Sequence, residues 1–196
     1  MRKIRLDRDL WLFHGVADSP LVRHELLRAH LAEGLGLAPS ELVLAREDQG
    51  KPILVSPTVP LWFNLASRDG VAVIATSHQG PVGVDVETLA HCQDVQGVAE
   101  HLFSSAEAHW LAERPESVRP LGFARLWTGK EAVLKAQGQG ILQGLAEPVL
   151  APCSEDGPPW PPVVAKLRGT PYTVTWYSST VDEALIITAR AQAEPC

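Results

Sequence analysis

The sequence predicts an α+β protein made of two similar halves. In each half a helix with a proline in its first turn precedes short β-branched runs, and glycine and proline clusters separate these segments. The first series of segments gives way to the second near residue 95. We therefore expect an N-terminal half of residues 1–95 and a C-terminal half of residues 96–196.

Length and composition describe an ordinary globular chain. With 196 residues, 45% of them hydrophobic and 20% charged, the chain can bury the core of one domain or of two small ones. No apolar run reaches the roughly 18 residues that cross a bilayer, and the charged N-terminal segment does not resemble a secretory signal. A net charge of −6 argues against general binding of nucleic acid, which needs a basic surface. We expect neither a membrane nor a nucleic-acid partner.

The cysteines and histidines do not indicate a zinc or redox centre. Cys92, Cys153 and Cys196 lie far apart, and none of the seven histidines pairs at the spacing of metal ligands. The glycine-rich phosphate loop of P-loop nucleotide-binding proteins is also absent from the sequence. A reducing cytoplasm is the location that we expect for such a chain.

The first half begins with a predicted strand and a predicted helix. Residues 1–9 alternate charged and apolar side chains, as a strand does. Ser19 and Pro20 start the helix, with a capping hydroxyl before a proline in the first turn. Gly34 and Gly36 are expected to end it.

Two strands close the first half. Residues 71–76 form a short apolar and β-branched run, and residues 77–81 are typical of a turn. Residues 82–87 are therefore expected to return as the antiparallel neighbour of the first run.

Alternation along this returning strand places Gly83, Asp85 and Glu87 on one face and three valines on the other. Two carboxylates on a strand are often no more than the solvated side of a half-buried sheet, and this interpretation stays open. Gly83 favours a different interpretation, in which this face of the strand is approached closely. A position without a side chain lets a ligand or another backbone approach the same face.

The second half repeats the order of helix and strands. Ser104 and Glu107 have the spacing of a capping box, and Pro120 opens a longer helix that runs to Ala136. A proline-rich loop follows that helix. Three strand-like runs then cover residues 163–167, 172–177 and 184–189.

One face of the long helix is unusual. Phe123, Trp127, Glu131 and Lys135 follow one another at intervals of four residues, so that two charged side chains extend an aromatic stripe. A glutamate four residues before a lysine is also a common exposed pair worth only about 0.2–0.5 kcal/mol, and that interpretation stays open. If the stripe faces inward, Glu131 would join the carboxylates of the strand at a site for a hard divalent cation.

Six segments, taken in order along the chain, resemble the Sfp-type 4'-phosphopantetheinyl transferases. They are Gly50-Lys51-Pro52, Phe63-Asn64-Leu65, Gly83-Val84-Asp85-Val86-Glu87, Phe103-Ser104-Ser105-Ala106-Glu107, Trp127-Thr128-Gly129-Lys130-Glu131-Ala132-Val133-Leu134-Lys135 and Gly138-Gln139-Gly140-Ile141. Each is weak alone, whereas their order and spacing together are specific. The resemblance implies the fold of that family, in which two similar α+β halves are related by a pseudo-twofold axis.

The resemblance implies an enzyme of the holo-[acyl-carrier-protein] synthase type. Such an enzyme transfers 4'-phosphopantetheine from coenzyme A to a serine of an apo acyl or peptidyl carrier protein, depends on Mg²⁺, and releases adenosine 3',5'-bisphosphate. By this resemblance Asp85, Glu87 and Glu131 hold the Mg²⁺ ion. Glu131 is also a candidate base for the serine, and Lys135 is placed to stabilise the leaving phosphate.

The resemblance also implies contacts between the protein and coenzyme A. Lys51, Lys130 and Lys135 are expected at its phosphates. Arg23, near the start of the first predicted helix, resembles the arginine that grips the nucleotide end.

This chain departs from the family in one of these segments. Where the family usually reads Asn-[Ile/Leu]-Ser-His-Ser, this chain reads Asn64-Leu65-Ala66-Ser67-Arg68. A histidine that commonly contacts a phosphate of coenzyme A is therefore missing. We expect Ser67 and Arg68 to meet the coenzyme at this place, with Arg68 supplying the charge.

The implied partners are coenzyme A and an apo carrier protein of fatty-acid, polyketide or nonribosomal peptide biosynthesis. We expect a monomer, because one chain supplies both halves of the site. Two other functions stay open. A relative without catalytic activity could bind carrier protein or nucleotide, and an Mg²⁺-dependent phosphoesterase could use the same carboxylates.

Overall fold

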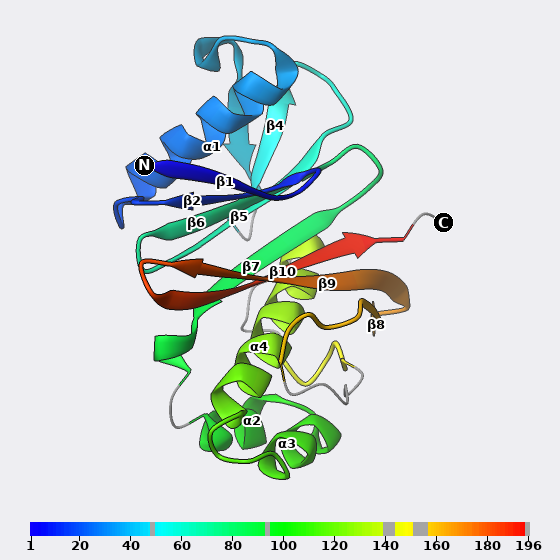
Figure 1. Cartoon of the computed structure of the whole chain (residues 1–196). Helices are drawn as coiled ribbons and strands as arrows, with labels where there is room; N and C mark the ends of the chain where they lie inside the picture. Colours follow the sequence, from blue (N-terminus) through cyan, green and yellow to red (C-terminus); the bar gives the residue numbers. More distant parts are fainter. Residues whose placement is uncertain (48–49, 93–94, 139–143, 151–156, 195–196) are drawn as a thin grey trace.

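The described part of the chain forms two four-stranded antiparallel sheets, a two-stranded sheet and four α-helices, as the computed structural model in Figure 1 shows. The structure describes all residues except 48–49, 93–94, 139–143, 151–156 and 195–196. The mixed α and β class that the sequence predicts is confirmed. Among the described helices none is both long enough and apolar enough to cross a membrane.

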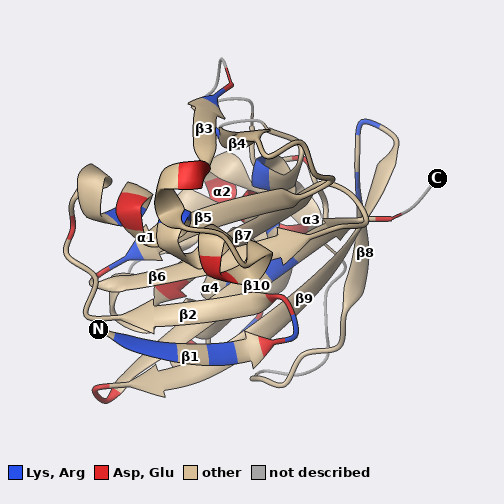
Figure 2. Cartoon of the chain, turned by 90° about the horizontal axis from the view of Figure 1, so that it is seen from above, with Lys and Arg blue, Asp and Glu red and all other residues tan. Residues whose placement is uncertain are grey.

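The first sheet has the strand order β1-β2-β6-β5. Its strands are β1 (Arg2–Asp7), β2 (Leu10–His14), β5 (Trp62–Arg68) and β6 (Val71–Ser77). Strand β1 is a mostly exposed edge strand, and Figure 2 shows stretches of blue, the colour of Lys and Arg, along it, although the whole chain is acidic.

Helix α1 (Pro20–Leu35) covers one face of this sheet, where Leu27 and Leu31 join the buried cluster of Phe13 and Ile74 (Figure 1). The predicted start is confirmed, although the Ser19 side chain makes no capping hydrogen bond. The end comes at Gly36, which has the left-handed conformation, and Gly34 still belongs to the helix. Beyond α1 lie the short helix η1 (Pro39–Glu41) and a hairpin of β3 (Val43–Arg46) and β4 (Pro52–Ser56).

The second sheet has the order β7-β10-β9-β8 and lies between the first sheet and helix α4 (Figure 1). Its strands are β7 (Val82–Thr88), β8 (Val163–Leu167), β9 (Thr170–Val181) and β10 (Ala184–Ala193). The described helices of this part are η2 (Leu89–His91), α2 (Gln96–Leu102), α3 (Ser105–Ala112) and α4 (Arg119–Ala136).

The prediction that residues 82–87 pair with residues 71–76 is wrong. Strand β6 has β2 on one edge and β5 on the other, so it offers β7 no free edge. The chain leaves the first sheet at the turn before β7, and β7 pairs antiparallel with β10, with Ala189 opposite Asp85. The division between residues 95 and 96 stays a prediction.

The predicted alternation of β7 agrees with the structure. Val82, Val84 and Val86 belong to a buried cluster with residues of the first sheet. Gly83 faces α4 instead, because a Cβ atom there would lie 2.0 Å from the carbonyl oxygen of Ala132 and 2.4 Å from the amide nitrogen of Ala136. The backbone that approaches Gly83 is therefore that of α4.

A buried ion pair also fixes α4. Lys130 Nζ lies 2.7 Å from Glu107 Oε2 and donates to the carbonyl oxygens of Leu145 and Pro148, and the two charged side chains are 0% and 1% exposed. Glu107 also closes the predicted capping box with Ser104. An ammonium group has three protons to donate, and Lys130 uses them all inside the core. The expectation that Lys130 contacts a phosphate of coenzyme A disagrees with this geometry.

Replacing Gly83 by alanine is expected to lower the free energy of unfolding by about 3 kcal/mol, because the new methyl group meets backbone atoms of α4 that cannot turn aside. Urea unfolding followed by circular dichroism measures this. Gly34→Ala is the matched control, since a Cβ atom at Gly34 would meet nothing within 4 Å. Inside a helix that substitution should raise stability by about 0.5–1 kcal/mol. Equal effects of the two substitutions would contradict the close approach.

Lys130→Met is expected to lower the free energy of unfolding by about 3–5 kcal/mol, because Glu107 would keep a buried charge without its partner. The double variant Lys130→Met/Glu107→Gln should recover part of this loss in the same urea experiment. Lys166→Met, on an exposed position of β8, serves as the control and should change little. A loss below about 1 kcal/mol for Lys130→Met would show that the pair is not a structural element.

Candidate active site

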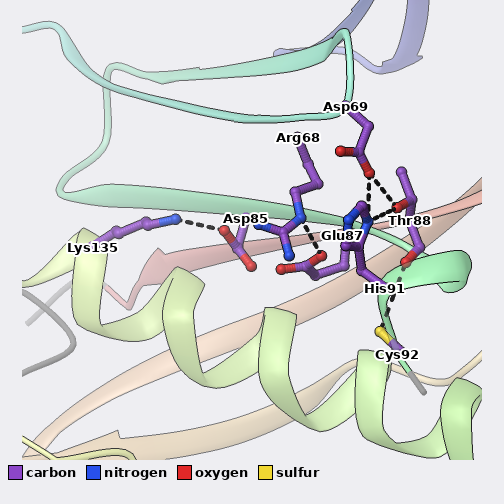
Figure 3. A network of polar contacts seen from close by, with 8 residues as sticks. All are labelled: Arg68, Asp69, Asp85, Glu87, Thr88, His91, Cys92 and Lys135. Carbon is purple, nitrogen blue, oxygen red and sulfur yellow. Dashed lines mark hydrogen bonds and ion pairs between the residues drawn. The ribbon is translucent and has the colours of Figure 1, made fainter. Parts of the chain in front are cut away.

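Lys135 joins two of the three predicted metal-binding carboxylates. Its Nζ atom lies 2.5 Å from Asp85 Oδ1 (Figure 3) and 3.8 Å from Glu131 Oε2. Strand β7 supplies Asp85, and consecutive turns of α4 supply Glu131 and Lys135. The inward position predicted for Glu131 agrees with the structure, where this side chain is 3% exposed.

Glu87, the third predicted ligand, has a different partner. Its Oε2 atom lies 3.0 Å from Nε of Arg68 at the end of β5 (Figure 3). Glu87 is 12% exposed and Arg68 is 42% exposed, so this ion pair lies at the edge of the site. Among the described residues, no three histidine, cysteine or carboxylate side chains gather in an arrangement that would hold a metal ion. The three carboxylates are nevertheless neighbours, because the charges of Asp85 and Glu87 add to burial in raising the pKa of Glu131.

Burial governs the protonation of these carboxylates. It raises the pKa of Asp85, against the opposing charge of Lys135. Burial and then the charge of Asp85 raise the pKa of Glu87, and burial raises the pKa of Glu131 to about 7. Burial acts to lower the pKa of Lys135, but the charges of Asp85 and Glu131 outweigh it and raise this pKa. Near neutral pH Lys135 is therefore a cation, and Glu131 is divided between its charged and neutral forms.

Three buried carboxylate oxygens of the site have no hydrogen-bond partner: Asp85 Oδ2, Glu131 Oε1 and Glu87 Oε2, the last of which lies 3.0 Å from Nε of Arg68. Buried acceptors are normally satisfied by protein, water or an ion, so oxygens without a protein partner are open to such a ligand. Mg²⁺ binds oxygen atoms and is commonly held by one or two carboxylates together with substrate phosphates and water. Asp85 and Glu131 therefore fit this ion, whereas Glu87 is engaged by Arg68.

A cavity of about 480 Å³ lies beside these carboxylates. Among the residues that line it are Arg23 of α1, Ser67 and Arg68 of β5, and Lys135 of α4. Arg23 also forms an ion pair with the exposed Asp18, at 2.5 Å. Four of the residues predicted to contact coenzyme A thus meet around one space, and its guanidinium and ammonium groups suit phosphate oxygens.

Lys51, another predicted phosphate contact, lies outside this group. Its Nζ atom donates to the carbonyl oxygens of Lys135 and Ala136, at 2.7 and 3.2 Å, and so caps the C-terminal end of α4. Burial lowers the pKa of Lys51. The residue lines a separate cavity of about 280 Å³ with Phe63 and Gln137. Of the Gly138–Ile141 segment, only Gly138 lies within the described residues.

Sequence reasoning missed a polar cluster beside Arg68. Asp69 Oδ2 lies 2.6 Å from Nδ1 of His91 and accepts a hydrogen bond from the Thr88 hydroxyl (Figure 3). This cluster ties the turn between β5 and β6 to the end of β7. The Asp69-Gly70 pair is typical of a hairpin turn, but no local pattern indicates that the turn faces His91.

Comparisons with known proteins found a matching family model and several relatives. Residues 81–189 match the family model of the 4'-phosphopantetheinyl transferase superfamily. The chain is 35% identical over 120 residues to the 4'-phosphopantetheinyl transferase HetI of Nostoc sp. This match covers 60% of this chain and 51% of that protein. It is 33% identical over 141 residues to the 4'-phosphopantetheinyl transferase psf-1 of Bacillus pumilus, and this match covers 72% of this chain and 58% of that protein. Identity to AcpT of Escherichia coli (strain K12) is 39% over 98 residues, 49% of each chain.

The chain spans about half the length of the curated relatives it matches. The range that matches the family model contains β7 and α4, and with them Asp85, Glu131 and Lys135. It covers more than half of the 196 residues. The chain therefore belongs to the 4'-phosphopantetheinyl transferase superfamily.

Proposed function

We propose that this protein transfers 4'-phosphopantetheine from coenzyme A to a serine of an apo acyl or peptidyl carrier protein, with Mg²⁺. One observation carries the proposal. Two buried carboxylate oxygens without partners, on Asp85 and Glu131, lie beside Lys135 and next to a cavity that Arg23 and Arg68 line. Such a site can hold a cation and a chain of phosphates together.

Asp85 and Glu131 would hold the Mg²⁺ ion, which supplies neutralisation of the pyrophosphate charge when bound. Lys135 is about one-third exposed, at 29%, and lies on the wall of the cavity. Its ammonium group would donate to the phosphate that leaves with the nucleotide. Glu131 would accept the proton of the carrier serine, directly or through water.

The same proposal extends to the architecture. We infer that the two sheets and their outer helices form two similar α+β halves related by a pseudo-twofold axis, divided between residues 95 and 96. Each four-stranded sheet carries one long helix on its outer face, α1 on the first and α4 on the second (Figure 1). Arg23 and Arg68 would come from one half and Glu131 and Lys135 from the other, so a monomer would hold a complete site.

Glu131→Gln is expected to reduce transfer at least about 100-fold, because the neutral amide can neither accept the serine proton nor offer the cation a charge. The measurement is the mass of a panel of apo carrier proteins after incubation with Mg²⁺ and coenzyme A. Glu113→Gln, at an exposed position after α3, is the matched control and should leave transfer unchanged. Chelation of Mg²⁺ should stop the wild-type reaction and added Mg²⁺ should restore it.

Two results of this experiment would contradict the proposal. If the wild-type protein modified no carrier of the panel, transfer would not be its activity. If it released adenosine 3',5'-bisphosphate from coenzyme A with no carrier present, the site would belong to a phosphoesterase. Glu131→Gln that unfolds, as seen by circular dichroism, would indicate a structural role for the carboxylate.

Arg23→Ala is expected to raise the KM for coenzyme A by roughly tenfold with little change in kcat, because the guanidinium group would contact the nucleotide end of the donor. Arg28→Ala is the matched control. Arg28 lies on the same helix but donates to the carbonyl oxygen of Leu42, outside the cavity. An unchanged KM in Arg23→Ala would remove Arg23 from the binding site.

A further inference from the structure

Arg68, like Lys135, lies where the cavity of about 480 Å³ and the carboxylates meet. Its guanidinium group lines the cavity, and its Nε atom forms the ion pair with Glu87. The residue lies in the segment where this chain departs from its family, so family patterns do not explain the pair. Glu87 is nearly buried, and Arg68 is the more exposed partner, with 42% of its side chain accessible.

We propose that Arg68 withholds Glu87 from the cation, so that Asp85 and Glu131 alone hold Mg²⁺ and Arg68 sets the affinity of the site. The inference rests on the proposed Mg²⁺ site but not on the transfer reaction. It assigns control of the affinity for the cation to a side chain that does not contact the cation.

The partners of the three carboxylates support this division. Asp85 Oδ2 and Glu131 Oε1 are buried and have no hydrogen-bond partner, so each can accept a cation without breaking a contact. Glu87 Oε2 also lacks a hydrogen bond, but it lies 3.0 Å from a guanidinium nitrogen. A cation at Glu87 would first have to displace that positive charge. At such separations two unit charges interact strongly even when partly solvated.

The cavity offers Arg68 an alternative partner. Arg23 and Lys135 line the same space, so an anion there would face three cationic side chains. An anion that draws Arg68 away would free Glu87 for the cation. Binding of anion and cation would then strengthen each other, as linkage between two sites requires.

The test measures the affinity for Mn²⁺ alone, as a spectroscopic substitute for Mg²⁺, by electron paramagnetic resonance of the free ion. It uses the full chain at about pH 8, above the pKa of about 7 of Glu131, without coenzyme A. Arg68→Ser is expected to bind Mn²⁺ about tenfold more tightly than the wild-type protein, because it frees Glu87 and removes a competing charge. Arg23→Ser removes a charge from the same cavity without freeing Glu87, and should change the affinity less than about twofold.

A double-mutant cycle separates the release of Glu87 from a general charge effect. Glu87→Gln alone should leave the Mn²⁺ affinity within about twofold of the wild-type value, since Glu87 does not hold the ion. In the Arg68→Ser background the same change should abolish the gain. If Arg68→Ser binds no more tightly, or if Glu87→Gln alone weakens binding about tenfold, the inference is wrong. Equal gains for Arg68→Ser and Arg23→Ser would overturn it as well.

Each outcome can be told apart from failure of the proposed function. A protein that modifies no carrier, but whose Arg68→Ser variant shows the expected gain in Mn²⁺ affinity, would retain this inference and lose the proposed activity. Circular dichroism of all four variants checks folding. Arg68→Gln, which keeps more of the side-chain volume, provides a second variant and should show the same gain if Arg68→Ser does not fold.

Discussion

The close approach of β7 to α4 at Gly83 is the constraint on which the site depends. The helix backbone occupies the space that any side chain at this position would need. Because successive residues of a strand alternate between faces, Asp85 points the same way as Gly83 and so meets Lys135 of the helix. The valines on the other face of β7 pack on the first sheet. One strand thus holds the helix on one side and the first sheet on the other.

Two lysines of α4 show how burial separates a structural charge from a functional one. Lys130 makes three short contacts to Glu107 and two carbonyl oxygens, and Glu107 is itself fully engaged in the cap of α3. Lys135 contacts Asp85 and Glu131, and a buried oxygen of each carboxylate remains without a hydrogen-bond partner. A completed buried network stabilises a fold, whereas an incomplete one is costly unless a ligand completes it.

Local periodicity predicted the faces on which two of the carboxylates lie. The period of two placed Asp85 on the face of Gly83, and the period of four placed Glu131 inward, since both patterns depend only on backbone geometry. The partner of β7 was predicted wrongly because strand pairing depends on distant residues, here β10. The partners of Lys130 could not be predicted for the same reason, because they come from α3 and from residues 145 and 148. The short elements β2, β3, β4 and α2 were not predicted, since few residues carry each pattern.

The two sheets are held together by more than the Arg68–Glu87 ion pair, so the opening of that pair would not separate them. Arg68 on β5 and Asp69 beside it both reach β7 or the turn after it, one through Glu87 and the other through Thr88 and His91. Loss of the first contact leaves the second in place, and the valines of β7 remain buried against the first sheet. Apolar burial therefore holds the sheets together, and the exchange of partners proposed for Arg68 would not need them to separate.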